Sequence, residues 1–181
     1  MKNNHDSGFG SISQSVNDDA VQTPALDLRK YLSGPITACG LFFSRSGRVK
    51  RSFTMDMVGC WDGNRGTLDE HFRYNNGETG NRCWHLTFTD DETFVASAHD
   101  LVGTAKGRQS GNVAVMRYRL RVMRGRSAIT VGMEDWFYLI NDRTLINRAR
   151  MSKFGVRVGE LMVTFRRCPA IEAPAPGSAA P

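Results

Sequence analysis

No proline occurs between Pro35 and Pro169, yet clusters of turn-forming residues interrupt this stretch about every ten residues. The clusters are Ser44-Arg45-Ser46-Gly47, Asp62-Gly63-Asn64, Asn75-Asn76-Gly77, Asp90-Asp91, Gly107 to Gly111, Arg124-Gly125 and Asn141-Asp142-Arg143. Between the clusters, polar and apolar residues alternate, and Val, Thr, Phe and Tyr are common. This pattern is typical of an antiparallel up-and-down meander, closed as a barrel or folded as a sandwich. We expect an all-β barrel of about 8–10 strands.

Helix is expected only in short pieces, namely "ALDLRKYLSG" at 25–34 and the region from Ser152 to Gly155. Residues 1–24 are rich in Ser, Asn, Asp and Gly, and residues 169–181 are rich in Pro and Ala. Neither composition offers enough apolar surface to offset the entropy of ordering, so both are predicted to be disordered tails. The expected organisation is one β-barrel domain over residues 25–168, which should stay folded without the tails.

The charge of the chain is concentrated in its body. The whole chain carries 24 basic and 18 acidic residues, or +6, whereas residues 25–168 carry 23 basic and 14 acidic residues, or 23 − 14 = +9. A basic body attracts anionic partners without naming them. No apolar run reaches the roughly 18–20 residues of a membrane span, and the N-terminus has no hydrophobic signal region, so the chain as written is expected to be cytoplasmic.

The four cysteines lie at positions 39, 60, 83 and 168, without a Cys-x-x-Cys pair or zinc-like spacing to histidine. They are predicted to be reduced and mostly packed thiols. His71, His85 and His99 match no metal pattern and are assigned structural or surface roles. Neither a metal nor a cofactor is expected.

Strand registers follow from matching apolar faces across each turn. A two-residue turn at Arg45-Ser46 would pair Phe42 with Val49, Ala38 with Phe53 and Ile36 with Met55, with Arg51 on the inner face opposite Gly40. A turn at Arg124-Gly125 would pair Leu120 with Ile129, Tyr118 with Val131 and Met116 with Met133, with Asp135 on the same face. At Asn75-Asn76-Gly77, only a three-residue loop with a left-handed Gly77 sets Leu68 opposite Trp84.

The hairpin "DWFYLINDRTLINRARMSKFG" at 135–155 allows two registers. A two-residue loop would turn Arg148 and Arg150 inward beside Asp135, a costly burial unless they bind a ligand anion, as in a carboxylate-binding carrier. A three-residue loop turns Leu145, Ala149 and Met151 inward and sets Asn147 beside Phe137. Arg150 then faces Glu134 and Arg148 faces Trp136, within reach of a cation–π contact. The second register buries more apolar surface and is favoured.

Four segments resemble a known bacterial family: "GCWDG" at 59–63, "LDEHFRYNNGE" at 68–78, "DWFYL" at 135–139 and "INRARMSKFGVRVGE" at 146–160. The family is the domain of unknown function DUF3833, and the resemblance covers roughly Leu26 to Arg167. It implies a lipocalin-like (calycin-type) barrel and no established activity. Many relatives look like lipoproteins with a lipidated cysteine, a feature not seen in the first 30 residues here. A periplasmic or membrane-associated location therefore stays open beside the cytoplasmic one.

Sequence motifs for catalysis are absent. No phosphate loop, dinucleotide fingerprint or Gly-x-Ser-x-Gly sequence occurs. Asp69 and Glu70 are adjacent on a strand, so they should point to opposite faces and form no acid–base pair. The segment "GTAKGRQSGN" at 103–112 is interpreted as a connecting loop or lid.

Arg117, Arg119 and Arg121 share one face of a strand whose other face is apolar. We assign them to the solvated outside of the barrel and expect no nucleic-acid partner, because no exposed aromatic residue is interleaved for base stacking. An anionic membrane surface stays open as a partner.

The leading hypothesis is a binding protein whose barrel holds a small apolar or amphipathic molecule, such as a lipid or fatty acid. Its candidate ligand-binding residues are Arg51, Tyr118, Asp135, Asn147, Arg148 and Arg150. The alternatives are an enzyme acting on a lipid-like substrate by acid–base chemistry through Asp135, and an interaction module with a filled core. Binding ranks above catalysis because no nucleophile or acid–base pair stands out.

Overall fold

The computed structural model describes residues 23–125 and 127–168. Apart from Thr23 and Pro24, the two predicted tails lie outside the described residues. The elements are α1 (Leu28–Tyr31), β1 (Gly34–Ser44), β2 (Val49–Asp62), β3 (Arg65–Tyr74), β4 (Thr79–Phe88), β5 (Thr93–Ser97), β6 (Ala105–Ser110), β7 (Val113–Arg124), β8 (Ser127–Asn141), β9 (Thr144–Lys153) and β10 (Val156–Arg167).

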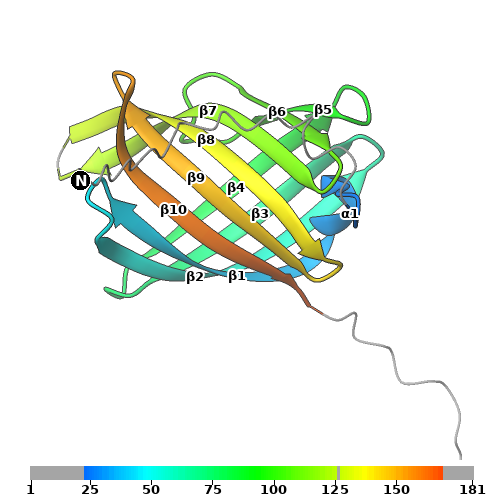
Figure 1. Ribbon diagram of the computed structural model, residues 1–181, viewed down its shortest axis with the longest axis horizontal. Coiled ribbons are helices and arrows are strands. Elements are labelled where there is room, and N and C mark those ends of the chain that lie inside the picture. Colours follow the sequence, from blue (N-terminus) through cyan, green and yellow to red (C-terminus); the bar gives the residue numbers. More distant parts are fainter. Residues whose placement is uncertain (1–22, 126, 169–181) are drawn as a thin grey trace, which may run out of the picture.

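The ten strands form a closed antiparallel barrel in which each strand pairs with its neighbours in the sequence (Figure 1). The barrel closes where β1 pairs with β10, from Ile36 opposite Arg167 to Ser44 opposite Gly159. The prediction of an all-β barrel with 8–10 strands is therefore confirmed, and the sandwich alternative is wrong. The region from Ser152 to Gly155 is not helical, because it ends β9 and turns at Phe154 and Gly155.

Side chains alternate between the inside and the outside of the barrel along each strand. In β2, Phe53, Met55 and Met57 are buried inside, whereas Thr54 and Asp56 are exposed. This alternation is what the sequence pattern predicts for strands with one buried face. The inner faces of all strands together form one core, which also includes residues of the segment that carries α1.

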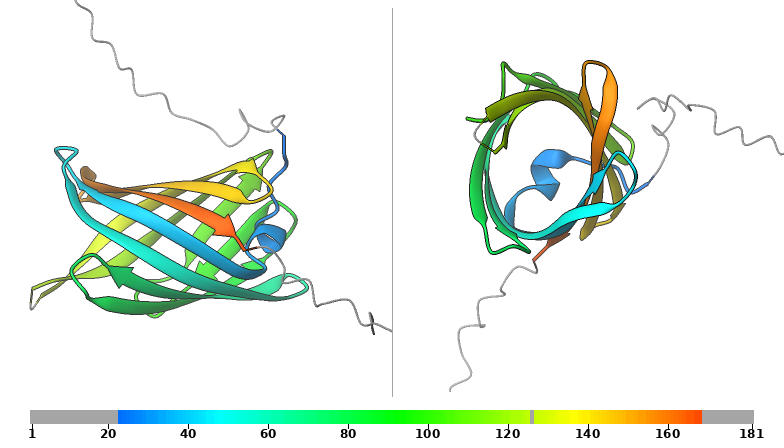
Figure 2. Two further views of the ribbon diagram at one scale, coloured as in Figure 1. Left: turned by 90° about the horizontal axis from the view of Figure 1, so that it is seen from below. Right: turned by 90° about the vertical axis from the view of Figure 1, so that its left-hand side faces the viewer.

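The segment around α1 closes one end of the barrel (Figure 2). Leu26, Leu28 and Tyr31 are buried there, and the Tyr31 hydroxyl lies 3.0 Å from the carbonyl oxygen of Arg143. A Cβ at Gly59 of β2 would lie 1.6 Å from the Leu32 carbonyl oxygen, so only glycine lets the segment approach this closely. The opposite end, where the β1–β2, β3–β4, β5–β6, β7–β8 and β9–β10 connections lie, has no such cover among the described residues.

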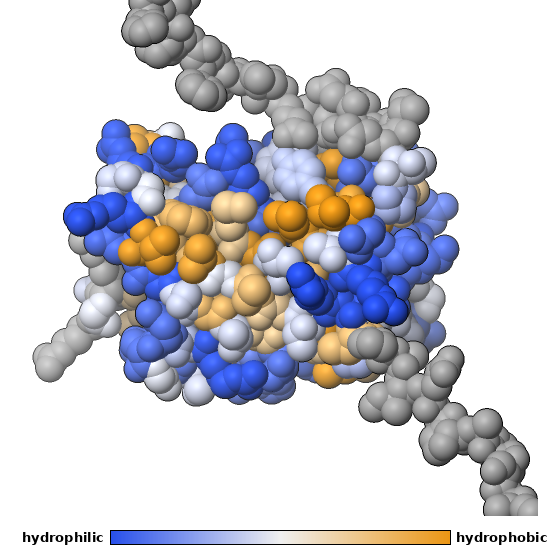
Figure 3. Space-filling model, turned by 60° about the horizontal axis from the view of Figure 1, so that its bottom comes forward, coloured by the Kyte–Doolittle hydropathy of each residue, from blue (hydrophilic) through white to orange (hydrophobic). Residues whose placement is uncertain are grey.

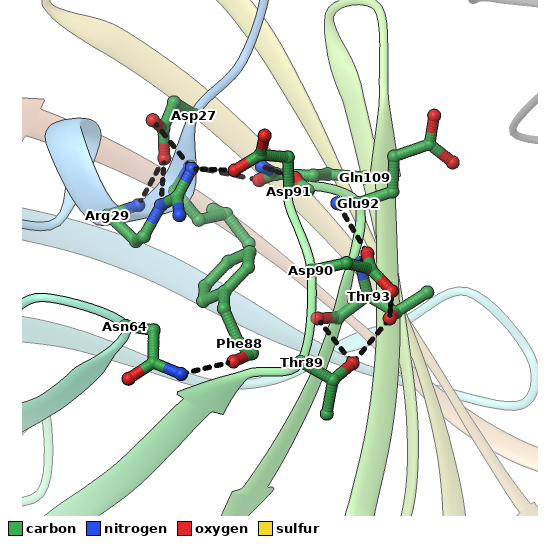
Figure 4. A network of polar contacts seen from close by, with 11 residues as sticks. Asp27, Arg29, Asn64, Phe88, Thr89, Asp90, Asp91, Glu92, Thr93 and Gln109 are labelled. Atoms are coloured by element: carbon green, nitrogen blue, oxygen red, sulfur yellow. Dashed lines mark hydrogen bonds and ion pairs between the residues drawn. The ribbon is translucent and has the colours of Figure 1, made fainter.

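Polar contacts hold α1 to the loop between β4 and β5 (Figure 4). Asp27 caps the helix by accepting a hydrogen bond from the backbone N–H of Arg29 at 3.0 Å. The Arg29 side chain also pairs with Asp91 at 3.2 Å. The buried Gln109 side chain accepts from the backbone N–H of Leu28 at 3.0 Å and donates to the Asp91 carbonyl at 2.8 Å. These contacts fix the closed end of the barrel.

Two predicted registers are wrong by two residues. Ala38 pairs with Met55 and Ile36 with Met57. One residue of the difference comes from a three-residue turn between Ser44 and Arg48, and the other from an irregularity between Phe42 and Phe43. In β7 and β8, Tyr118 pairs with Met133, Leu120 with Val131 and Met116 with Asp135. A shift of two residues keeps every side chain on its predicted face, so the apolar pattern alone does not distinguish these registers.

The two other register predictions are confirmed. Leu68 pairs with Trp84, and Gly77 has a φ of 82°. In the hairpin of β8 and β9, Glu134 faces Arg150, Trp136 faces Arg148 and Phe137 faces Asn147. The register with Arg148 and Arg150 inside the barrel is therefore wrong. The expected contact of Arg148 with Trp136 is replaced by an ion pair with Glu160 of β10.

The segment 103–112 is mostly strand rather than a loop or lid, since it contains β6. Its central Gly107 pairs with Phe94 of β5, and the Phe94 ring occupies the space that a side chain at 107 would need. Gly107 thus serves close packing, whereas Gly103 and Gly111 have positive φ and lie in the connections on either side of β6.

The outer wall carries free thiols and a band of apolar side chains. All four cysteines are free, but Cys39 and Cys60 are exposed and Cys83 and Cys168 are half-buried, so the prediction of mostly packed thiols is wrong. Apolar residues gather over the wall formed by β1, β2 and β10 (Figure 3), where the exposed Leu41 and Met162 pair directly. Within the described residues, no helix is long and apolar enough to cross a membrane.

Candidate functional site

The barrel encloses a cavity of about 120 Å³ that is lined mainly by apolar side chains. Five polar side chains, each from a different strand, also line it: Glu70 (β3), Arg82 (β4), Tyr118 (β7), Asp135 (β8) and Asn147 (β9). An apolar cavity with a few polar groups is the usual form of a small-molecule site.

Glu70 and Arg82 are paired across strands β3 and β4, two residues along from the Leu68–Trp84 pair. A guanidinium nitrogen of Arg82 lies 3.6 Å from Oε2 of Glu70. The other side of the same guanidinium binds Asp100 through contacts of 3.0 Å from Nε and 2.7 Å from Nη2 to Oδ2. Arg82 also lies near the rings of Phe72 and Trp84. Asp100 thus accepts hydrogen bonds from two of the three guanidinium nitrogens of Arg82.

Asp135 lies across the cavity wall on β8, beside Tyr118 of the neighbouring β7. The Tyr118 hydroxyl donates to Oδ2 of Asp135 at 3.1 Å. Asp135 Oδ1 and Glu70 Oε2 are buried and have no hydrogen-bond partner within the described part of the chain. Both side chains are more than nine-tenths buried. Buried polar atoms without partners are rare, so these two oxygens require an explanation.

Burial controls the ionisation of both carboxyl groups. Burial raises the pKa of Asp135 to about 7, although the hydrogen bond from Tyr118 and the charge of Arg82 act in the opposite direction. Burial likewise raises the pKa of Glu70 to about 7 against the opposing effects of Arg82 and a hydrogen bond from Trp84. Near neutral pH, each group can therefore be present as acid or as carboxylate.

The remaining polar groups of the cavity are fixed in one state. Burial raises the pKa of Tyr118 well above its usual value, so its hydroxyl stays protonated. Burial alone would lower the pKa of Arg82, but Glu70 and Asp100 outweigh it and the pKa is raised. The amide of Asn147 donates to the Trp136 carbonyl at 3.3 Å.

The structure brings three of the six predicted site residues together. Tyr118, Asp135 and Asn147 line the cavity. Arg51 is on the inner face as expected, but near the open end, where it pairs with Glu78 and covers the Tyr74 ring at 3.5 Å.

Arg148 and Arg150 lie outside the cavity. Each faces a residue on the outside of β8, and Arg148 pairs with Glu160. They therefore do not form the carboxylate-binding pair that the rejected register would give.

Sequence reasoning missed Glu70 and Arg82 as cavity residues. It treated Glu70 only in relation to Asp69, which is exposed on the opposite face as expected. The confirmed pairing of Leu68 with Trp84 already sets Glu70 opposite Arg82 on the same inner face, and this could have identified the pair.

Other reactive residue types do not assemble into a site. His71, His85 and His99 are exposed, and no group of three or more potential metal ligands occurs within the described residues. A hydrogen bond to Asp69, together with burial, raises the pKa of Cys83 to about 11, so this thiol is not an activated nucleophile.

This closed barrel with a cavity at its centre is a lipocalin-like fold. The S-type phycobiliprotein lyase CPES from Guillardia theta is a similar solved structure, with a TM-score of 0.61 over 87% of this chain and 99% of that chain. The two sequences are 7% identical, so the likeness concerns the fold alone.

The particular family is given by the sequence. The chain belongs to the family described as Protein of unknown function (DUF3833), whose model matches residues 7–167. No curated protein matches the chain.

Proposed function

We propose that the barrel binds a small apolar or amphipathic molecule in its central cavity. The observation that carries this proposal is the combination of an apolar lining with two buried carboxyl oxygens that accept no hydrogen bond within the described residues. A bound molecule would contact the apolar wall and supply the missing hydrogen bonds. The lipocalin-like fold of the solved neighbour supports the proposal at the level of architecture only.

The size of the cavity limits the part of the ligand that can be enclosed. A cavity of about 150 Å³ in another protein encloses benzene, and the cavity here is about 120 Å³. A small ring or a short alkyl chain therefore fits inside, and the rest of a longer, lipid-like molecule would extend through the open end.

Native mass spectrometry of the purified protein tests the proposal, together with saturable uptake of small alkyl compounds. Ala149→Leu would fill the cavity, because Ala149 lines it, and should abolish uptake. Ala128→Leu makes the same change at an exposed position of β8 and should leave uptake intact. Equal uptake by both variants, or none by the unmodified protein, would refute binding in the cavity.

Catalysis is a second candidate, favoured by one observation. Asp135 is a buried carboxyl group whose pKa of about 7 suits proton transfer near neutral pH. If the protein is an enzyme that acts on a lipid-like molecule, Asp135→Asn should abolish conversion while uptake persists. Turnover that survives this substitution would remove Asp135 as the acid or base.

A further inference from the structure

The polar part of the cavity is acidic. Glu70 and Asp135 each present a buried oxygen that accepts no hydrogen bond within the described residues, and the only cation among the residues that line the cavity is Arg82, which lies 3.6 Å from the Glu70 oxygen. Because Asp100 binds two nitrogens of that guanidinium, little of its positive charge is left for a ligand. A ligand carboxylate would therefore meet two carboxyl groups and an arginine that is already neutralised.

We infer that the ligand carries a hydrogen-bond donor at its polar end, best a protonated primary amine, and not a carboxylate. This inference rests on the proposed function, since it names the ligand class for the same cavity. An ammonium group has three donors and no acceptor, so it suits Asp135 Oδ1 and Glu70 Oε2, which accept no hydrogen bond within the described residues. A hydroxyl group can donate one such hydrogen bond without the charge. The apolar lining would contact the alkyl or ring part of the molecule.

Three compounds with the same alkyl chain test this directly: octylamine, octanol and octanoate, titrated calorimetrically into the full chain near pH 7.5. Octylamine should bind at least about tenfold more tightly than octanoate, because a charge-assisted hydrogen bond replaces a like-charge contact. Octanol should fall between them.

Substitutions in the cavity should change this order. Glu70→Gln and Asp135→Asn should each reduce the preference for octylamine over octanoate by about tenfold. Glu134→Gln removes a carboxylate next to Asp135 in sequence but on the outside of the barrel. It should change the preference much less, because the charge of Glu134 affects the pKa of Asp135 less than burial, Tyr118 or Arg82 does.

The outcomes separate the inference from the proposed function. Octanoate binding as tightly as octylamine in the unmodified protein would overturn the amine assignment and leave the proposed function standing. Binding of none of the three compounds would overturn both. If one variant fails to fold, the unmodified protein and the second variant still decide the question.

A different observation concerns the open end of the barrel. Three hairpin ends that are adjacent in the barrel order lie there: residues 43–52, 121–125 with 127–129, and 151–158. We call these residues the basic rim. They contain eight Lys or Arg residues and no Asp or Glu. The two other connections at this end, β3–β4 and β5–β6, carry Glu78 and Asp100, which pair with Arg51 and Arg82. At the closed end, by contrast, the loops at 62–64, 89–92 and 142–143 contain five acidic residues and one basic residue, Arg143, and α1 adds Arg29 and Lys30.

Exposed apolar side chains stand among the basic ones on this rim. Val49, Met123 and Val156 are about half exposed or more, and Phe154 is 94% exposed. Phe154 has a φ of 52°, a left-handed conformation that is unfavourable for a bulky residue, and its ring projects from the β9–β10 turn. The amino group of Lys153 lies 5.4 Å from the centre of that ring.

We propose that the basic rim docks on an anionic lipid bilayer. Basic side chains interleaved with exposed apolar ones are the chemistry by which protein surfaces bind anionic lipids. The closed end carries acidic side chains beside its basic ones, whereas the basic rim carries no acidic residue, so the barrel would bind with its open end toward the lipid. This proposal depends on the rim alone and would hold even if the cavity bound nothing.

Vesicle flotation with the full chain tests this proposal, using neutral phosphatidylcholine vesicles and vesicles with about 30 mol% phosphatidylglycerol. Binding should occur to the anionic vesicles and fall as salt is added. Arg48→Gln with Lys50→Gln should weaken it by about tenfold or more. Phe154→Asn should also weaken it, and Asn tolerates the left-handed conformation.

Matched controls lie at the closed end. Ile140→Ser removes an exposed apolar side chain from the end of β8, and Lys30→Gln removes a charge from α1. Both should leave vesicle binding unchanged. Three results would overturn the proposal. They are an equal loss of vesicle binding in the rim and control variants, no binding to anionic vesicles, and binding of single-stranded DNA instead of vesicles.

Discussion

Phe94 of β5 lays its ring over Gly107 of β6, directly across the strand pair, so that a Cβ at Gly107 would stand 2.1 Å from Cζ of Phe94. Phe94 is almost completely buried. β5 and β6 are the shortest strands of the barrel. They pack together here because the Phe94 ring fills the space left by the missing side chain of Gly107.

Gly107→Ala should therefore lower the free energy of unfolding by about 1–3 kcal/mol, because the Phe94 ring must move within a packed core. Chemical denaturation measures this change. Gly80→Ala is the matched control, since a Cβ there would lie 3.9 Å from the Tyr74 ring and its φ is not left-handed. A similar loss in both variants would contradict the role of the Phe94 contact.

Tyr118→Phe should destabilise the fold by about 1–3 kcal/mol, because it removes the hydrogen bond to Asp135 Oδ2. That carboxyl group would then lack a partner on both oxygens. The loss should be larger at pH 8 than at pH 5, since this hydrogen bond favours the ionised form of Asp135. A loss independent of pH would show that the hydroxyl does not act on the ionisation of Asp135.

The stability of the barrel should decrease as the pH rises from about 4 to about 7. The pKa of Asp135 and of Glu70 is raised to about 7 in the folded state, against about 4 in the unfolded chain. Their protonated forms therefore favour folding, and this contribution is complete below pH 4 and lost above pH 7. Above pH 7, Asp135→Asn and Glu70→Gln should each be more stable than the unmodified protein, by on the order of a few kcal/mol.

Glu134→Gln supplies the control of opposite sign for this pH dependence. The pKa of Glu134 is lowered: burial opposes ionisation, but hydrogen bonds from Trp136 and Arg117 outweigh it. Its contribution to stability is therefore present above the unfolded pKa and lost as the pH falls. Urea denaturation of the three variants across this pH range separates the two behaviours.

Gln109→Ala should destabilise the closed end of the barrel by about 1–3 kcal/mol, because it leaves the backbone N–H of Leu28 and the carbonyl of Asp91 without their buried partner. Amide hydrogen exchange should become faster in α1 before it does in β8. Unchanged protection of Leu28 would contradict this.

Arg150→Ala should change both stability and ligand uptake little, by less than about 1 kcal/mol in the free energy of unfolding, because the side chain lies on the outside opposite Glu134. Thermal denaturation and calorimetric titration measure the two effects. A large loss of uptake would restore the carboxylate-binding hypothesis that the observed register rejects.

The fold was predictable because strands and turns leave patterns in short, continuous stretches of the sequence. Alternation of polar and apolar residues identifies each strand, and turn clusters mark nearly every boundary. Which residues face inward could be predicted even where the register could not, as with Tyr118, whose partner is Met133 and not Val131. β6 was missed because Gly107 looks like a loop residue until Phe94 is placed over it.

The site was predictable only in part, because it depends on contacts between distant strands. The inward position of Asp135 followed from alternation, and the choice of register at Arg148 followed from the cost of burying charge. The pairing of Arg82 with Asp100 could not be inferred, since Asp100 lies in the connection between β5 and β6 and has no strand pattern to place it.

Barrel closure also has a consequence for how the chain folds. Nine of the ten strand pairs join neighbours in the sequence, whereas the pairing of β1 with β10 brings Ile36 to Arg167. That last pairing closes the longest loop of any strand pair, and as the non-local pairing it is expected to be the slow step of assembly. Until it forms, the sheet is open along two long edges and the cavity has no complete wall. A ligand that binds only inside the closed barrel would thus stabilise the pairing of β1 with β10 and slow the separation of these two strands.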